Sequence, residues 1–285
     1  MEYMRFGPKG SEIPVVVEDG KHYAISDLVT DIGPSFWAHG PGKVAAALRE
    51  GTLTEFDPTG LRIGAPISAA TSVICIGQNY VAHAAESGSE PPERPIVFFK
   101  TPNTLTGPYD TVGIPPGSLK TDWEVELAVV IGSQASYLPN LKAARAAIGG
   151  FMVVNDLSER TYQIDDSGGQ WSKGKCVKDF LPAGPILKTP ESVDASDLRL
   201  RSWVNGDPRQ DSSTADMIFS VEDIILDLSY YMQLEPGDVI CTGTPQGVAL
   251  SGRFPYLTSG DVSEIEISGL GKQRQEYFQI EVAKS

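Results

Sequence analysis

The feature that most constrains the fold is a series of short apolar runs, separated by turn residues, that begins near Ser72. Short runs of apolar, β-branched and aromatic residues bounded by turns are typical of strands. The runs read SVICIG, IVFFK, WEVELAVVIG, FMVVND, GPILKT, LRLRSWVNG, GDVICTG and VSEIEIS. Two segments have a helical pattern instead, 141–150 and 221–234, and the second is entered through Ser220 with acids in its first turn. The pattern predicts a β-rich α+β domain.

The first seventy or so residues have a different pattern. Two β-branched or aromatic runs flank Asp19-Gly20, a pair that strongly favours a hairpin turn. Further along, VAAALREG suits a helix that ends at Gly51. Residues 52–70 contain several breakers and no periodicity, which is typical of a connection. We therefore expect a small N-terminal domain of a hairpin and short helices over 1–70, and a catalytic domain over 71–285.

The charge balance limits the classes of partner. The 285 residues include 37 acidic and 23 basic ones, and the formal net charge of -14 repels a polyanion, which argues against nucleic acid as a partner. The 3 cysteines are widely spaced and predict reduced thiols rather than a disulfide framework or a CxxC metal site. No window has the pattern of a signal peptide or a membrane span, so we expect a cytoplasmic protein with no membrane partner.

Three carboxylates meet if their predicted strands are neighbours. Glu124 and Glu126 are two residues apart in a strand, so both side chains point to one face, and Asp156 ends the run FMVVND. A Glu-x-Glu pair alone is more often a solvated strand face, and Asn155-Asp156 alone is more often a turn. A buried cluster of the three acids, however, calls for a cation, and an all-oxygen site suits Mg²⁺ or Mn²⁺ better than zinc.

One histidine stands beside a carboxylate. His83 follows the run SVICIG, and Glu86 lies at i+3, on the same face if the segment is helical. Such a pair suits a general base that activates water, although an exposed helix with an incidental pair fits about as well. The sequence contains no GxxxxGK[ST], GxSxG or GxGxxG motif, which argues against nucleotide binding and serine-hydrolase chemistry.

Taken in order, several of these segments resemble the fumarylacetoacetate hydrolase superfamily: GQNYVAHAAE, PIVFFK, TDWEVELAVVIG, NDLSERTYQ, QWSKGK, LEPGDVICTGTPQGV and GDVSEIEISGLG. The resemblance covers roughly residues 70–285 and implies a mixed β-roll catalytic domain, usually in a homodimer. It implies that Glu124, Glu126 and Asp156 hold the divalent cation, and that the catalytic residues are His83, Glu86 and Lys175. It also implies a pocket lined by Gln163 and Thr244. The sequence departs from the family pattern at Val177-Lys178-Asp179-Phe180, where an extra positive charge stands.

The resemblance implies hydrolysis of a carbon–carbon bond in a 2,4-diketo acid such as an acylpyruvate. His83, oriented by Glu86, would activate the water, while the cation and Lys175 would stabilise the enolate. We expect Tyr80 and Lys100 to contact the anionic substrate as well. The same metal site could serve an oxaloacetate-type decarboxylase or a keto-acid isomerase, and a non-catalytic keto-acid binder is the remaining alternative.

The segment from Glu159 to Lys175 is more similar to family members that cleave 2,4-diketo-3-deoxy sugar acids than to those acting on products of aromatic-ring fission. A hydroxylated substrate tail requires hydrogen-bonding side chains around it. The segment offers four of them, Gln163, Gln170, Ser172 and Lys173. We therefore expect a hydroxyl-bearing substrate.

Overall fold

Two neighbouring strands, β9 (Val125–Ile131) and β10 (Ile148–Asn155), form the centre of the fold. In the computed structural model, which describes residues 1–281, they pair antiparallel, with Val125 opposite Asn155. They belong to a nine-stranded sheet in which only β16 and β4 pair parallel. Its other strands, in spatial order around this pair, are β3 (Lys21–Ala24), β2 (Ile13–Glu18), β1 (Glu2–Phe6) and β13 (Leu187–Lys188) on one side, and β16 (Val239–Cys241), β4 (Val73–Gly77) and β5 (Ile96–Lys100) on the other.

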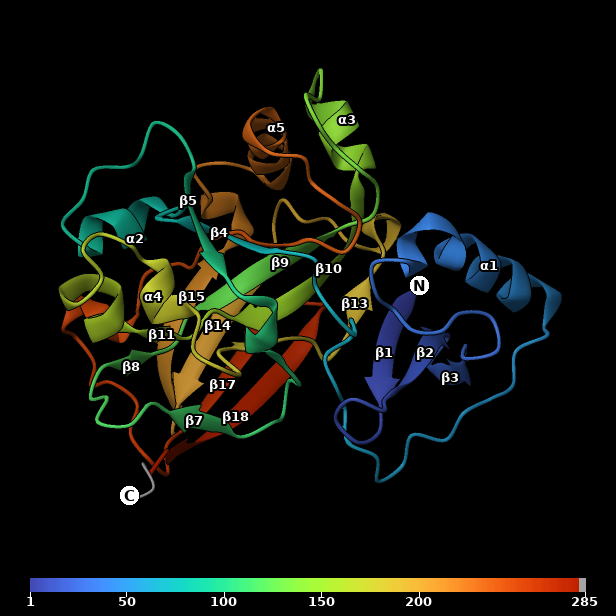
Figure 1. Ribbon diagram of the computed structural model, residues 1–285, viewed down its shortest axis with the longest axis horizontal. Helices are drawn as coiled ribbons and strands as arrows, with labels where there is room; N and C mark the ends of the chain where they lie inside the picture. Colours follow the sequence, from blue (N-terminus) through green and yellow to red (C-terminus); the bar gives the residue numbers. More distant parts are fainter. Residues whose placement is uncertain (282–285) are drawn as a thin grey trace.

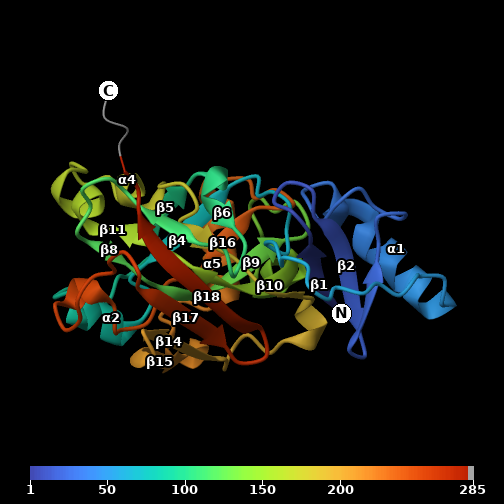
Figure 2. The same cartoon turned by 90° about the horizontal axis from the view of Figure 1, so that it is seen from below.

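A five-stranded sheet packs against the centre of the large one, and its strand β18 lies in the foreground of Figure 2. Its strands in order are β15 (Asp207–Ser213), β14 (Arg199–Val204), β17 (Val262–Ile267), β18 (Gly271–Gln279) and β7 (Val112–Ile114). Two short pairs complete the strands: β8 (Thr121–Asp122) with β11 (Ser158–Glu159), and β6 (Leu105–Thr106) with β12 (Leu181–Pro182).

The alternation of side chains along β9 separates two cores. Leu127 and Val129 pack on the side of the five-stranded sheet, whereas Ala128 and Val130 belong to the core on the opposite face. Because side chains alternate along a strand, Glu126 shares the face of Ala128. An acidic side chain is thereby placed on a buried face of the central strand.

The helices lie on the outer sides of the sheets (Figure 1). The α-helices are α1 (Phe36–Glu50), α2 (Val81–Glu86), α3 (Leu141–Ala146), α4 (Ser172–Lys175) and α5 (Val221–Tyr231). A π-helical turn, η2, spans Thr161–Asp165, and 3₁₀ turns span Pro102–Thr104 (η1), Pro190–Ser192 (η3), Thr214–Asp216 (η4) and Ala249–Ser251 (η5). Among residues 1–281, no helix has the length and apolar character needed to cross a membrane.

The predicted elements are mostly confirmed, with three corrections to helix boundaries. The β-rich α+β class, the hairpin at Asp19-Gly20 and the helix after Ser220 are all present. The last helix, predicted over 221–234, ends at Tyr231. The helix predicted over 141–150 ends at Ala146, because Gly149 and Gly150 already belong to β10, where neighbouring atoms leave no room for a Cβ. The helix that ends at Gly51 begins earlier than its alanine-rich segment, at Phe36, whose ring is buried in the core.

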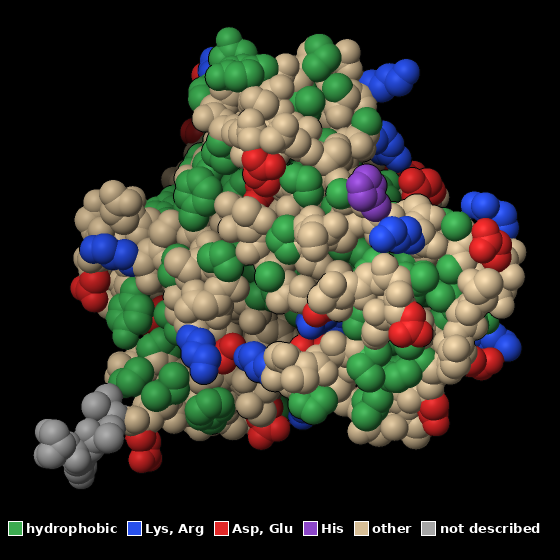
Figure 3. All heavy atoms as spheres, turned by 45° about the vertical axis from the view of Figure 1, so that its right-hand side comes forward, with side chains coloured by type: hydrophobic (Ala, Val, Ile, Leu, Met, Phe, Trp, Pro, Cys, Tyr) green, Lys and Arg blue, Asp and Glu red, His purple; other side chains and the backbone are tan. Residues whose placement is uncertain are grey.

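The N-terminal residues continue the large sheet. Strand β1 pairs with β13, so the hairpin of β2 and β3 extends the same sheet that contains β9 and β10. Helix α1 covers these strands at the right of Figure 1, and Figure 3 shows charged side chains of both signs dispersed over this side of the surface. A separate domain over residues 1–70 stays a prediction.

Candidate metal centre and active site

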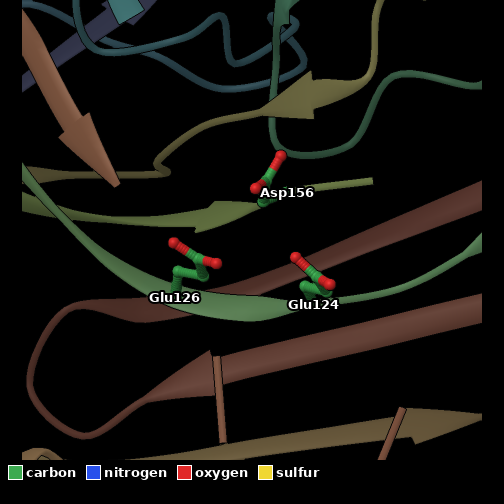
Figure 4. Close-up of side chains that lie close together, drawn as sticks. All are labelled: Glu124, Glu126 and Asp156. Atoms are coloured by element: carbon green, nitrogen blue, oxygen red, sulfur yellow. The ribbon is translucent and has the colours of Figure 1, made fainter. Parts of the chain in front are cut away.

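Three buried carboxylates converge where β9 begins and β10 ends. Glu124 directly precedes β9, Glu126 is its second residue, and Asp156 directly follows β10. Their side chains point toward one another in Figure 4, and one oxygen of each lies within 4.8 Å of the others. The antiparallel register causes the convergence, since Val154 pairs with Glu126 and the Asp156 amide donates to the Glu124 carbonyl at 2.9 Å. The predicted neighbourhood of the three acids is confirmed.

The two glutamates have opposite electrostatic environments. Burial raises the pKa of Glu126 well above its usual value, and the negative charges of Asp156 and Glu124 add to the effect. Burial acts in the same direction on Glu124, but the adjacent positive charges of Lys175 and Arg160 outweigh it and lower the pKa of Glu124 to about 2. The cluster therefore holds one carboxyl group, Glu126, that its neighbours leave without a compensating charge.

Three buried cations contact the other two acids. Lys175 Nζ donates to Glu124 Oε2 at 2.5 Å and to Asp156 Oδ2 at 2.8 Å. Lys100 Nζ donates to Asp156 Oδ1 at 2.6 Å, and Arg160 Nη2 donates to Glu124 Oε1 at 2.7 Å. Each carboxylate oxygen has a further lone pair, so these bonds do not prevent it from binding a cation.

The chemistry of the donor set fits a divalent cation. Three carboxylates in a buried site match the oxygen preference of Mg²⁺ and Mn²⁺, and Glu126 would ionise readily beside a positive ion. Glu124, Glu126 and Asp156 are thus the residues that would hold such an ion.

The His83–Glu86 pair is folded into the same site. His83 Nδ1 lies 3.0 Å from Glu86 Oε1, and the histidine is only 7% exposed. Because a carboxylate can only accept, Nδ1 donates the proton and the neutral ring keeps an acceptor at Nε2. The Gly247 amide donates to both oxygens of Glu86, at 3.0 and 3.1 Å, which fixes the carboxylate from the opposite side.

Most of these groups line one cavity of about 260 Å³, although Glu86 and Asp156 do not reach its wall. Its polar wall includes His83, Glu124, Glu126, Arg160 and Lys175, and its apolar wall includes Phe98, Ile164, Trp171 and Leu250. Asp156 lies deeper, where Lys100 and Lys175 hold its two oxygens. A small anionic molecule in the cavity would therefore meet a histidine, two cations and the carboxylate cluster together.

Comparison with known proteins identifies the family. The model of the fumarylacetoacetate (FAA) hydrolase C-terminal family matches residues 72–277. The chain belongs to the fumarylacetoacetate hydrolase family. It is 41% identical to the 2,4-didehydro-3-deoxy-L-rhamnonate hydrolase of Sphingomonas sp. (strain SKA58) over 281 residues, which are 97% of this chain and 95% of the relative. The protein is a hydrolase of this family.

Solved structures of fumarylacetoacetate hydrolase family proteins are similar over the whole chain. The fumarylacetoacetate hydrolase from the psychrophilic Exiguobacterium antarcticum has a TM-score of 0.83 and 29% identity, covering 98% of this chain and 100% of that one. The maleylpyruvate hydrolase from Sphingobium sp. SYK-6, solved with manganese(II) and pyruvate, has a TM-score of 0.80 and 25% identity, covering 99% and 100%. The fold of the fumarylacetoacetate hydrolase family therefore includes the N-terminal residues.

Two of the four residues predicted to contact the substrate line the cavity, and two do not. Gln163 and Thr244 line the cavity, as expected, and their roles stay predictions. Tyr80 and Lys100 do not line it: Tyr80 is fully buried, and Lys100 lies behind Asp156, where its ammonium also donates to the Leu157 carbonyl at 3.0 Å. For these two residues the geometry favours a structural role over contact with substrate.

The segment from Glu159 to Lys175, which includes η2 and α4, also differs from the expectation. Of the four hydrogen-bonding side chains expected around the substrate tail, only Gln163 lines the cavity. Gln170 is exposed, Ser172 Oγ accepts from the Phe99 amide at 3.1 Å, and Lys173 Nζ reaches the Asp166 carbonyl at 3.4 Å. The sequence alone does not reveal that Gln170, Ser172 and Lys173 lie outside the cavity wall.

Sequence reasoning missed Arg160. Arg160 is 2% exposed, lines the cavity and contacts the carboxylate cluster through its guanidinium. A basic residue four positions after Asp156, next to Glu159 at the end of a strand, carries only a weak signal in a single sequence. What identifies it is the pairing of β8 with β11, which brings it beside Asp122.

Proposed function

We propose that this hydrolase cleaves a carbon–carbon bond in a 2,4-diketo acid, with Mg²⁺ or Mn²⁺ as its cofactor. The observation that carries the proposal is the single cavity that joins the carboxylate cluster to the His83–Glu86 pair. Two similar proteins support it: one is named a hydrolase of a 3-deoxy sugar acid, and one was solved with manganese and pyruvate. When bound, the divalent cation would polarise the 2-oxo and carboxylate oxygens of the substrate.

His83 supplies the base in this proposal. Its Nε2 takes a proton from a water molecule as the oxygen adds to the C4 carbonyl, while Glu86 holds Nδ1–H and stabilises the positive imidazolium. Collapse of the adduct breaks the C3–C4 bond. The bond's electron pair passes to C3 and spreads into the 2-oxo group as an enolate, while the C4 side leaves as a carboxylic acid. A proton returned to C3 from the imidazolium gives pyruvate and restores the base.

The buried cations stabilise the charge that develops. Lys175 and Arg160 line the cavity beside Glu124, so both lie close to any carboxylate or enolate oxygen held over the cluster. Preorganised positive groups of this kind contribute a few kcal/mol each to transition-state stabilisation, to an order of magnitude. Burial also keeps them from being screened by water.

We further propose a 3-deoxy sugar acid as the substrate class. Besides Gln163 and Thr244, the cavity is lined by Gln78 and Ser87, which supply further hydrogen-bonding groups. A site with such groups discriminates against a substrate tail that lacks hydroxyls, because the polar groups are then left unpaired.

A substrate screen tests the function. The purified protein with Mn²⁺ or Mg²⁺ is given 2,4-diketo acids, loss of the enol absorbance is followed, and pyruvate is quantified. We expect stoichiometric pyruvate, and a higher kcat/KM for a diketo-deoxy sugar acid than for an alkyl acylpyruvate of equal length. Release of CO₂ from oxaloacetate, or conversion of a keto acid without cleavage, would instead identify the decarboxylase or isomerase alternative. Binding without turnover would identify a keto-acid binder.

The assembly and location belong to the same proposal. We propose a homodimer in the cytoplasm, as the family resemblance implies. Light scattering after gel filtration should give about twice the 30.6 kDa of the chain, and a monomer mass would contradict the dimer.

A further inference from the structure

Asp122 is a buried carboxylate that the proposed chemistry leaves without a role. It lies on the short strand β8, two residues before Glu124, and is 0% exposed. It accepts hydrogen bonds from the backbone amides of Trp123 at 2.9 Å, Ala249 at 2.9 Å and Leu250 at 3.0 Å. Arg160 Nε completes the set at 2.8 Å. A carboxylate so fully satisfied holds its partners in fixed positions.

The guanidinium of Arg160 joins three acceptors. Beside its bond to Asp122, Nη2 donates to Glu124 Oε1 at 2.7 Å and Nη1 donates to Gln163 Oε1 at 2.7 Å. The donors of a guanidinium form a rigid planar fork, so fixing the Nε edge determines where both Nη groups point. Asp122 is therefore in a position to orient the contacts that Arg160 makes in the cavity.

The backbone partners of Asp122 also belong to the cavity wall. Leu250 lines the cavity, and the segment Gly247–Leu250 is held at one end by Glu86 and at the other by Asp122. The same segment thus connects the partner of His83 to the partner of Arg160.

We propose that Asp122 is a positioning residue, which holds the Arg160 guanidinium with Nη2 toward Glu124 and Nη1 toward Gln163. The inference rests on the proposed function only where turnover is measured, because cation affinity is a second readout. In Asp122→Asn, the amide oxygen can still accept from the Ala249 amide, but the NH₂ group faces Arg160 with a donor where a charged acceptor stood. The guanidinium then loses one of its two carboxylate partners and the contact that fixes its Nε edge, while Glu124 remains as the other partner.

The experiment measures Mn²⁺ affinity by calorimetry and turnover for four proteins: wild type, Asp122→Asn, Arg160→Lys and the double variant. Loss of a group that orients a metal ligand costs about 10–100-fold in affinity or activity. We expect Asp122→Asn to lower both by amounts in that range while the protein stays folded. In the Arg160→Lys background, where the fork is absent, Asp122→Asn should have little further effect.

Asp238→Asn is the matched control. Asp238 is also a buried carboxylate, 2% exposed, that accepts from a backbone amide at 2.7 Å, but it precedes β16 at the end remote from Thr244. We expect wild-type affinity and turnover for this variant.

Two results would overturn the proposal: wild-type affinity and turnover in Asp122→Asn, or an equal loss in both backgrounds, which would show that Asp122 does not act through Arg160. If Asp122→Asn fails to fold, the Arg160→Lys variant tests the proposal by itself, because lysine keeps the positive charge but cannot bond all three acceptors. Wild-type Mn²⁺ affinity and turnover in that variant would then refute the proposal. If the wild type turns over no diketo acid, the proposed function fails, whereas the Mn²⁺ affinities still test Asp122.

Discussion

At the scale of single residues, the site shows how position alone separates two chemically identical groups. Glu124 and Glu126 are two residues apart on one strand face, yet the pKa of Glu124 lies at about 2 and that of Glu126 well above its usual value. Lys175 and Arg160 contact Glu124 directly, whereas Glu126 accepts from the neutral Gly243 amide at 2.8 Å. Glu126 is therefore the acid whose charge depends most on a bound cation.

We predict that Glu126→Gln loses most of its Mn²⁺ affinity and its turnover without losing stability. The amide oxygen of glutamine can still accept from Gly243, so the local structure is kept while a ligand charge is removed. The raised pKa means that ionised Glu126 opposes folding in the metal-free protein, so removing the charge should leave the free energy of unfolding at pH 7 equal or higher. Calorimetry and urea unfolding measure the two effects, and unchanged Mn²⁺ affinity would refute the ligand assignment.

His83→Ala should separate catalysis from cation binding. Removing a general base lowers kcat by about 10²–10⁴-fold, whereas the carboxylate cluster does not need the imidazole. Glu86 keeps its bonds from the Gly247 amide, so the cavity wall should persist. The control is His39→Ala, an exposed histidine of α1. A variant that hydrolyses the substrate at the wild-type rate would remove His83 from the mechanism.

At the scale of elements, the site depends on how closely α4 approaches its neighbours. The helix carries Lys175 and packs against η2 and β11, and Gly174 is the contact point. A Cβ at position 174 would overlap the Glu159 carbonyl oxygen and lie 2.5 Å from the backbone nitrogen of Gln163. The absence of a side chain at 174 is what allows Lys175 to reach Glu124 and Asp156.

Gly174→Ala should therefore displace α4 and impair both stability and turnover. Overpacking at a tight contact costs about 1–3 kcal/mol, and the shift would move the Lys175 ammonium away from the carboxylates. Urea unfolding and steady-state kinetics measure the two effects. The control is Gly42→Ala within α1, where a Cβ meets no atom within 4 Å, and there the helix should be equally or more stable. Wild-type stability and turnover in Gly174→Ala would show that α4 can move without affecting the site.

The sequence predicted those parts of the site that depend on local spacing. The shared face of Glu124 and Glu126, and the i+3 contact of His83 with Glu86, follow from the periods of strand and helix alone. Arg160 and Asp122 were missed because their contact exists only through the pairing of β8 with β11. Strand order and register are set by the whole core, which no local pattern contains.

At the scale of the whole molecule, an ion-pair network helps to join the N-terminal residues to the catalytic part. Arg62 Nη1 donates to Glu12 Oε1 at 2.8 Å, and its other edge contacts Asp110, 2.7 Å from Nε to Oδ1. Arg5 reaches Glu12 from the other side at 3.0 Å. Burial acts to raise the pKa values of Glu12 and Asp110, but the bonds to Arg62 and the surrounding donors outweigh it and lower both.

These lowered pKa values predict a specific loss of stability in acid. A carboxylate whose pKa is lower in the folded protein binds fewer protons there than in the unfolded chain, so it stabilises the fold above its unfolded pKa of about 4. This contribution to the free energy of unfolding disappears as the pH falls through the pKa of the folded protein.

Arg62→Met, which removes the shared partner, should therefore be less stable than wild type at pH 7, and the difference should shrink below about pH 4. Urea unfolding across this pH range measures the free energy of unfolding of both proteins. Lys21→Met, which breaks the exposed pair with Glu55, serves as the control and should follow wild type at every pH. A stability difference between Arg62→Met and wild type that does not change with pH would show that the two acids are not held by Arg62 in the way the structure indicates.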